Sequence, residues 1–143
     1  MIAPSIKSEH FVDSNIWIYA FIKSPASIAK TNRAAQILRQ ANLSVSSQIV
    51  NEVCRQLLRN GIAESALSPI IRSFYNRCQV VTLTREILLD ASALRQEYSL
   101  SFWDGLIVAS ALSIGATSFY TEDLHHGQVI RGQLTIVNLF IAK

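Results

Sequence analysis

The amino-acid sequence predicts an α/β fold, a three-layer α/β/α arrangement with helices on both faces of a central parallel sheet. Short β-rich runs alternate with segments of helical periodicity, which is the pattern of parallel strands joined by helical crossovers. The segment 106–112 is apolar nearly all round, as expected for a helix buried between layers. Of the 143 residues 50% are hydrophobic, and only 5 are Gly and 3 are Pro, so the chain is globular. We expect residues 1–143 to form one domain.

Local signals along the chain predict each element in turn. Ser46 or Ser47, Thr84 and Ser101 carry side-chain oxygens suited to helix N-caps, and Gly61 suits a left-handed C-terminal cap. Strands are expected at 10–12, 43–46, 79–83, 118–121 and 135–139, and helices at 14–22, 27–41, 47–61, 64–76, after Thr84, and from Ser101 to Gly115.

The charge balance indicates a basic surface around an acidic site. The chain has 13 Lys and Arg against 10 Asp and Glu, a net charge of +3. Five of the acids lie in apolar surroundings at expected element ends, and without them the balance becomes 13 against 5, or +8. That arrangement suits a polyanion held by its backbone, although a mildly basic soluble protein has the same overall charge.

Cysteine usage and hydropathy indicate a soluble protein of the cytoplasm. Cys54 and Cys78 are not spaced as metal ligands or as a disulfide framework, which favours reduced thiols in an intracellular protein. The N-terminal residues lack the apolar core of a signal peptide. The longest mostly apolar stretch, 106–116, is too short to cross a bilayer, so we expect no membrane association.

Acidic side chains are expected where strands end or helices begin. They are Asp13, Glu52, Asp104, Glu122 and Asp123. In open α/β sheets ligands bind at the carboxyl ends of strands, and Asp13 and Asp123 both follow short strands. Several carboxylates brought together there form a site for a hard divalent cation such as Mg²⁺ or Mn²⁺.

Each of these acids also has an ordinary structural explanation. Asp13 can cap a helix, Glu52 can pair with Arg55 or Gln56, Asp104 can complete a capping box with Ser101, and Glu122 and Asp123 can be turn residues. Their combined placement around one crevice is what favours a metal site.

The ordered motifs resemble those of a known family. They are Asp13-Ser-Asn-Ile-Trp-Ile-Tyr-Ala, Ser46-Ser-Gln-Ile-Val-Asn-Glu52, Phe102-Trp-Asp104-Gly-Leu-Ile-Val-Ala-Ser-Ala-Leu and Thr121-Glu-Asp123-Leu. From about residue 10 onward the chain resembles the PIN-domain ribonucleases, and more narrowly the toxins of VapBC-type bacterial toxin–antitoxin pairs. The resemblance implies a PIN-like fold with a parallel sheet of about five strands.

The resemblance also implies an activity and a set of site residues. It implies an endoribonuclease dependent on Mg²⁺ or Mn²⁺, with Asp13, Glu52, Asp104 and Asp123 as catalytic, metal-binding acids and with Asn15 and Thr121 in support. Many relatives carry a further acid about three residues after Thr-x-Asp, where this chain has His126, and Glu122 is a supporting candidate in its place. Homodimerisation and a cognate antitoxin that covers the acidic groove are likewise implied.

The expected chemistry is attack by a metal-activated water on a phosphodiester, which leaves a 5′-phosphate and a 3′-hydroxyl. Arg55 and Arg59 are four residues apart on one helix and are candidates for contact with the RNA backbone, or else part of a solvated face. Trp17 and Trp103 are interpreted as core or interface packing in preference to platforms on which bases stack.

Two other classes of protein fit parts of the sequence. Phosphoryl transfer through Asp13 usually requires a second acid close by and a downstream Lys, yet Asn15 stands two residues on and no Lys lies between Lys30 and Lys143. A catalytically inactive module that binds nucleic acid or another protein is the alternative outside enzymes. Its activity would survive Asp13→Asn.

Overall fold

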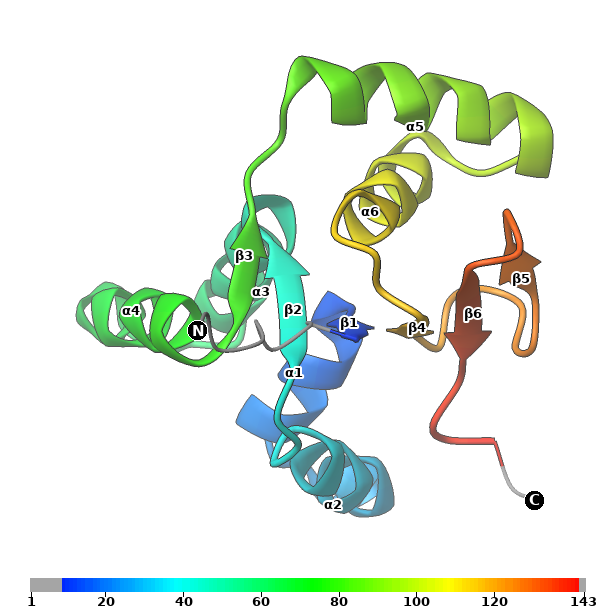
Figure 1. The fold of residues 1–143 in the computed structure, drawn as a ribbon. Coiled ribbons are helices and arrows are strands. Elements are labelled where there is room, and N and C mark those ends of the chain that lie inside the picture. The colour runs from blue at the N-terminus through cyan, green and yellow to red at the C-terminus, as the bar shows by residue number, and fades with distance from the viewer. Residues whose placement is uncertain (1–8, 142–143) are drawn as a thin grey trace, which may run out of the picture.

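A computed structural model describes residues 9–141, in which helices flank a six-stranded sheet (Figure 1). The strands are β1 (His10–Val12), β2 (Leu43–Ser46), β3 (Gln79–Val81), β4 (Ser118–Tyr120), β5 (Val129–Ile130) and β6 (Leu134–Val137). The helices are α1 (Ser14–Phe21), α2 (Ile28–Ile37), α3 (Ser47–Arg59), α4 (Leu67–Arg77), α5 (Arg85–Tyr98) and α6 (Phe102–Ser113). The expectation that the N-terminus lacks a signal peptide falls mainly on residues 1–8, outside this range.

The sheet has the order β3-β2-β1-β4-β6-β5, and its first five strands in this order are parallel. The expected parallel sheet of about five strands is thereby confirmed. The prediction missed β5, which has only two residues and pairs antiparallel with β6. A run that short carries no usable period in the sequence.

The helix boundaries agree with the expected caps. Ser46, Thr84 and Ser101 each accept a hydrogen bond from the backbone amide three residues on, and Gly61 has φ +87°. Two helices begin later than expected because the first turn is a 3₁₀ helix, at Pro25–Ser27 before α2 and at Glu64–Ala66 before α4. The helix expected to run to residue 41 ends at Ile37.

The layers pack around a continuous apolar core. In Figure 1, α5 and α6 lie on one side of the sheet, and α1 and α2 lie on the other. Helix α6 buries six of its twelve residues, from Gly105 to Ala111, as its apolar sequence predicted. Cys54 and Cys78 are free thiols, buried and half-buried. Within residues 9–141 no helix has the length and hydropathy needed to span a membrane.

Candidate active site

The topology places two acidic segments side by side. Chain order runs outward from β1 to β2 and β3 on one flank, then returns to β4 on the other, so the direction of winding reverses between β1 and β4. Such a reversal opens a crevice at the carboxyl ends of the strands. Val12 pairs with Tyr120 in register, and therefore Asp13 and Thr121 emerge next to each other at this edge.

Asp13 is the most buried of the acids, with 4% of its surface exposed. It caps α1, where its Oδ1 accepts a hydrogen bond from the Ser14 amide at 2.7 Å. Burial, reinforced by the charges of Asp123 and Asp104, raises the pKa of Asp13 from 3.8 to about 6, although hydrogen bonds from Thr121 and Ser14 oppose the shift. A cation in the cavity would remove most of this cost.

Thr121 and Asn15 connect Asp13 to Asp123. The buried Thr121 hydroxyl donates to Asp13 Oδ2 at 2.8 Å and accepts the Asp123 amide at 3.1 Å. The Asn15 amide donates to Asp123 Oδ2 at 3.0 Å and has two longer contacts of 3.5 Å, to Asp13 and Thr121. The Asn15 Oδ1 atom is buried and has no partner within the described residues. The Thr-x-Asp segment is thus tied to the end of β1.

Glu52 reaches the same crevice from the second turn of α3. Its carboxylate accepts two hydrogen bonds from Arg55, at 3.1 and 2.9 Å, and one from Gln56 at 3.0 Å. These bonds, with Arg55 the larger cause, lower the pKa of Glu52, so its charge is retained. Glu52 therefore pairs with Arg55 and Gln56, as its helical spacing predicted, and it also lines the crevice.

Asp104 lies in the first turn of α6, where the Ser101 hydroxyl accepts its backbone amide at 3.0 Å. The capping arrangement accounts for Ser101 and for the amide of Asp104, and Asp104 also lines the crevice, where its charge acts on Asp13. Gly105 follows because a Cβ there would lie 2.7 Å from Arg95 Cγ and 3.2 Å from the Ala91 carbonyl oxygen. Close packing of α5 on α6 therefore sets the position of Asp104.

One cavity of about 370 Å³ brings these acids together, and we call it the acidic cavity. Its lining residues are Asp13, Ser14, Asn15, Ile18, Tyr19, Glu52, Gln56, Trp103, Asp104, Glu122 and Asp123. All five acids singled out in the sequence line it. Thr121 lies directly behind it, fully buried.

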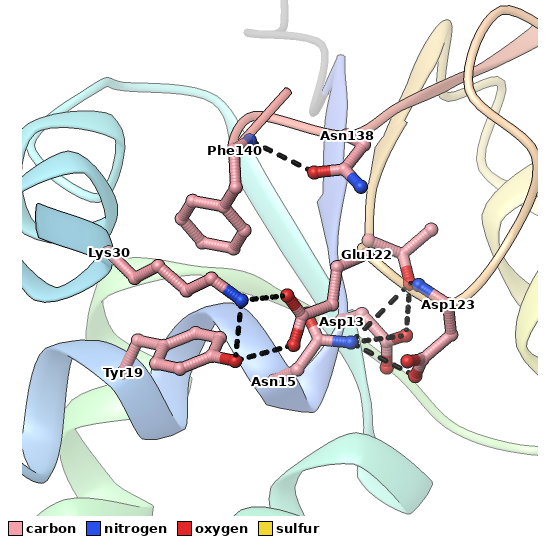
Figure 2. A network of polar contacts seen from close by, with 9 residues as sticks. Asp13, Asn15, Tyr19, Lys30, Glu122, Asp123, Asn138 and Phe140 are labelled. Carbon is pink, nitrogen blue, oxygen red and sulfur yellow. Dashed lines mark hydrogen bonds and ion pairs between the residues drawn. The ribbon is translucent and has the colours of Figure 1, made fainter. Parts of the chain in front are cut away.

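Glu122 points away from Asp13 toward a cluster that the sequence did not reveal. Figure 2 shows its carboxylate between Tyr19, whose hydroxyl donates at 2.6 Å, and Lys30, whose ammonium lies at 2.9 Å. Lys30 also lies over the rings of Tyr19 and Phe140, with 5.0 and 5.3 Å to the centroids. Hydrogen bonding to Glu122 raises the pKa of Lys30. Glu122 is thus neutralised and anchors the loop that carries Asp123.

The donor chemistry of the acidic cavity fits a hard divalent cation, because carboxylate and amide oxygens are what Mg²⁺ and Mn²⁺ prefer. Among residues 9–141, however, no three Asp, Glu, His or Cys side chains are close enough to hold an ion as they stand. The cavity therefore suits a Mg²⁺ ion that is held by one or two carboxylates and keeps several water ligands, which is how proteins usually bind Mg²⁺. The raised pKa of Asp13 and the unpartnered Asn15 oxygen both favour a cation there.

Several residues singled out in the sequence lie elsewhere. His126, which replaces the further acid of many relatives, accepts the Asn138 amide at 3.0 Å and is absent from the acidic cavity. Arg59 is exposed at the end of α3, and Arg55 stands beside the cavity as the partner of Glu52. Trp17 is a core residue, as interpreted, but core packing is wrong for Trp103, which is 47% exposed and lines the cavity.

Comparison with models of protein families shows which family the chain belongs to. The model of the PIN domain matches residues 10–131, which is most of the chain and includes every acid of the cavity. The chain belongs to the PIN-domain family. No curated protein matches it.

Solved structures share the fold of this PIN domain. A toxin–antitoxin complex from Klebsiella pneumoniae matches at 21% identity and a TM-score of 0.69, over 92% of this chain and 98% of the other. VapC20 from Mycobacterium tuberculosis, a toxin that cleaves the sarcin–ricin loop, matches at 17% identity and a TM-score of 0.64. The match covers 80% of this chain and 91% of VapC20. VapBC2 from Rickettsia felis, bound to a DNA fragment from its promoter, matches at 17% identity and a TM-score of 0.62. The match covers 90% of this chain and 98% of the other.

Proposed function

We propose that this PIN domain is an endoribonuclease dependent on Mg²⁺ or Mn²⁺, and that it is the toxin of a toxin–antitoxin pair. One observation carries the proposal: Asp13, Glu52, Asp104 and Asp123, from four separate parts of the chain, line one cavity at the topological switch point. Without a bound ion, the buried charge of Asp13 beside Asp104 and Asp123 would be offset only by the hydrogen bonds from Thr121 and Ser14.

In this proposal the four carboxylates have two roles, ion binding and orientation of the attacking water. Asp13 and Asp104 would hold the ion, and Glu52 and Asp123 would orient the attacking water. When bound, the ion polarises the phosphate and lowers the pKa of water. Thr121 keeps Asp13 oriented through its 2.8 Å hydrogen bond, and Asn15 keeps Asp123 oriented at 3.0 Å.

The cavity lining disfavours attack by the ribose 2′-hydroxyl. That route usually relies on an imidazole or an ammonium group as base or acid. Asp13, whose pKa is about 6, is assigned instead to the ion. No His or Lys belongs to the described lining of the acidic cavity. We therefore propose that water is the nucleophile.

Partners and assembly are proposed from the relatives that share the fold. Two of those structures are toxin–antitoxin complexes, which supports a cognate antitoxin for this chain and placement in the cytoplasm. Homodimerisation is consistent with the exposed apolar side chains of α5, among them Leu88 at 52% and Leu89 at 66% exposed.

The test is cleavage of a mixed RNA pool by purified protein in Mg²⁺, in Mn²⁺ and in EDTA. Asp13→Asn and Asp104→Asn should each lose most activity, and Glu86→Gln, an exposed acid on α5, should keep it. Well-folded protein that binds RNA equally with and without these substitutions, and never cuts it, would instead be an inactive binding module.

A further inference from the structure

Trp103 is an exposed indole at the rim of the acidic cavity. It precedes Asp104 on α6, and 47% of its surface is open, whereas Trp17 is 3% exposed. Besides the acidic cavity it lines a second hollow of about 560 Å³, formed with Asn51, Glu52 and Arg55 of α3. We call this the adjoining hollow, because Glu52 and Trp103 belong to both spaces.

The polar groups of the adjoining hollow are held in place and still have hydrogen-bonding capacity. Arg55 uses Nε and Nη2 on Glu52, at 3.1 and 2.9 Å, which leaves Nη1 without a partner in the described structure. The exposed amide of Asn51 makes no hydrogen bond to any described residue. The hollow is thus lined by an exposed indole, by a guanidinium with a free N–H group and by an amide without a partner in the described structure.

This chemistry selects the occupant. A second phosphate is disfavoured, because the one cation of the hollow, Arg55, is already paired with Glu52. An aliphatic ligand would leave Asn51 and Arg55 facing an apolar surface. A nucleobase matches both features, since its face stacks on an indole and its edge takes hydrogen bonds from amide and guanidinium groups.

We propose that the adjoining hollow binds one unstacked nucleobase of the substrate RNA. In this arrangement Trp103 stacks on the base, Asn51 and Arg55 contact its edge, and the attached phosphodiester reaches the acidic cavity across Glu52. The inference rests on the proposed function and assigns contact with the base to Trp103, Asn51 and Arg55. A base must be unstacked to enter the hollow.

Binding is tested by tryptophan fluorescence in an Asp13→Asn background, which leaves RNA uncut. The probes are a single-stranded RNA decamer of mixed sequence and an abasic decamer with the same backbone, both in Mg²⁺. The chain has two Trp, and Trp17 is buried, so quenching by a stacked base reports Trp103. The RNA should quench the emission, and the abasic decamer should not.

Three variants separate stacking from other roles. Trp103→Ala should weaken RNA binding by about 5- to 100-fold, and Trp103→Phe by about threefold or less, because Phe retains a flat face. Phe102→Ala is the matched control: Phe102 is adjacent and 74% exposed, but it stacks on Arg95 at 3.9 Å and lies outside both spaces. It should bind RNA as the parent does.

The inference is overturned if abasic and normal RNA bind equally, or if Trp103→Ala binds RNA unchanged. It is also overturned if Trp103→Ala alters only the solution mass, since Trp103 would then be a contact between protein chains. Cleavage by the wild type separates the two proposals. Cleavage without base-dependent quenching would contradict the nucleobase site alone, and quenching without any cleavage would contradict only the proposed nuclease.

Discussion

At the residue level, the charge of Asp13 is costly because the side chain is 4% exposed and faces Asp104 and Asp123. Its pKa is about 6 in the folded protein and 3.8 ordinarily, so the folded state binds the proton more tightly. The cost is absent below pH 3.8, builds up as the pH rises to 6, and is complete above that. At pH 7.5 it amounts to about 3 kcal/mol.

Because the charge of Asp13 lowers the unfolding free energy as the pH rises, the metal-free protein should become less stable at higher pH. Relative to Asp13→Asn, the wild type should lose about 2–3 kcal/mol of unfolding free energy between pH 4 and pH 7.5, because only the wild type acquires the buried charge. Denaturant unfolding in EDTA at several pH values measures the difference. A difference that does not depend on pH would show that Asp13 is not desolvated as described.

Thr121 is expected to matter through its hydroxyl. Thr121→Val removes the donor to Asp13 and leaves the Asp123 amide without its acceptor, which should destabilise the protein by about 1–3 kcal/mol and reduce RNA cleavage at least tenfold. Thr121→Ser keeps the hydroxyl and is the matched control. Equal cleavage by the Val and Ser variants would contradict this role.

At the element level, the packing of α5 on α6 sets the position of Asp104 in the first turn of α6. Gly105→Ala would place a Cβ 2.7 Å from Arg95 Cγ and 3.2 Å from the Ala91 carbonyl oxygen. Overpacking costs about 1–3 kcal/mol and outweighs the gain of about 1 kcal/mol in helix propensity, so we expect a net loss. Thermal unfolding measures it. Adding Arg95→Ala should recover part of the loss, and no recovery in the double variant would argue against this contact.

The same elements show what could be predicted from the sequence. Caps at Ser46, Thr84 and Ser101 are local signals, and the helices that they begin lie within a few residues of their predicted bounds. The acids that line the cavity could be singled out because four of them stand near element ends and the fifth, Glu52, borders the buried stripe of α3. Strand β5 was missed because two residues carry no period, and its pairing with β6 is set by tertiary structure.

Side-chain partners across the fold could not be predicted. Lys30 and Tyr19 meet Glu122 only because α2, α1 and the loop after β4 converge, and the sequence separations of 92 and 103 residues carry no signal for that contact. For the same reason the sequence left open whether Trp103 packs in the core or at an interface, and the structure excludes only the core. An aromatic at a helix start is compatible with a core, an interface or a site until its neighbours are known.

At the scale of the whole molecule, the proposed ion site would make the free energy of unfolding depend on a divalent ion. Mg²⁺ at ten times its dissociation constant should raise the unfolding free energy of the wild type by about 1.4 kcal/mol. Asp13→Asn should gain much less, because one of the proposed ligands is lost. Thermal unfolding with and without Mg²⁺ checks this, and equal gains in both proteins would place the ion elsewhere.

The chemistry of the RNA ends tests the central claim most directly. Attack by water in the acidic cavity should leave fragments with a 5′-phosphate and a 3′-hydroxyl. The wild type should make these fragments in Mg²⁺, and Asp13→Asn should not. Ligation of adaptors that require these ends, followed by sequencing, reads them out. Fragments that end in a 2′,3′-cyclic phosphate would show attack by the ribose hydroxyl and would contradict the account.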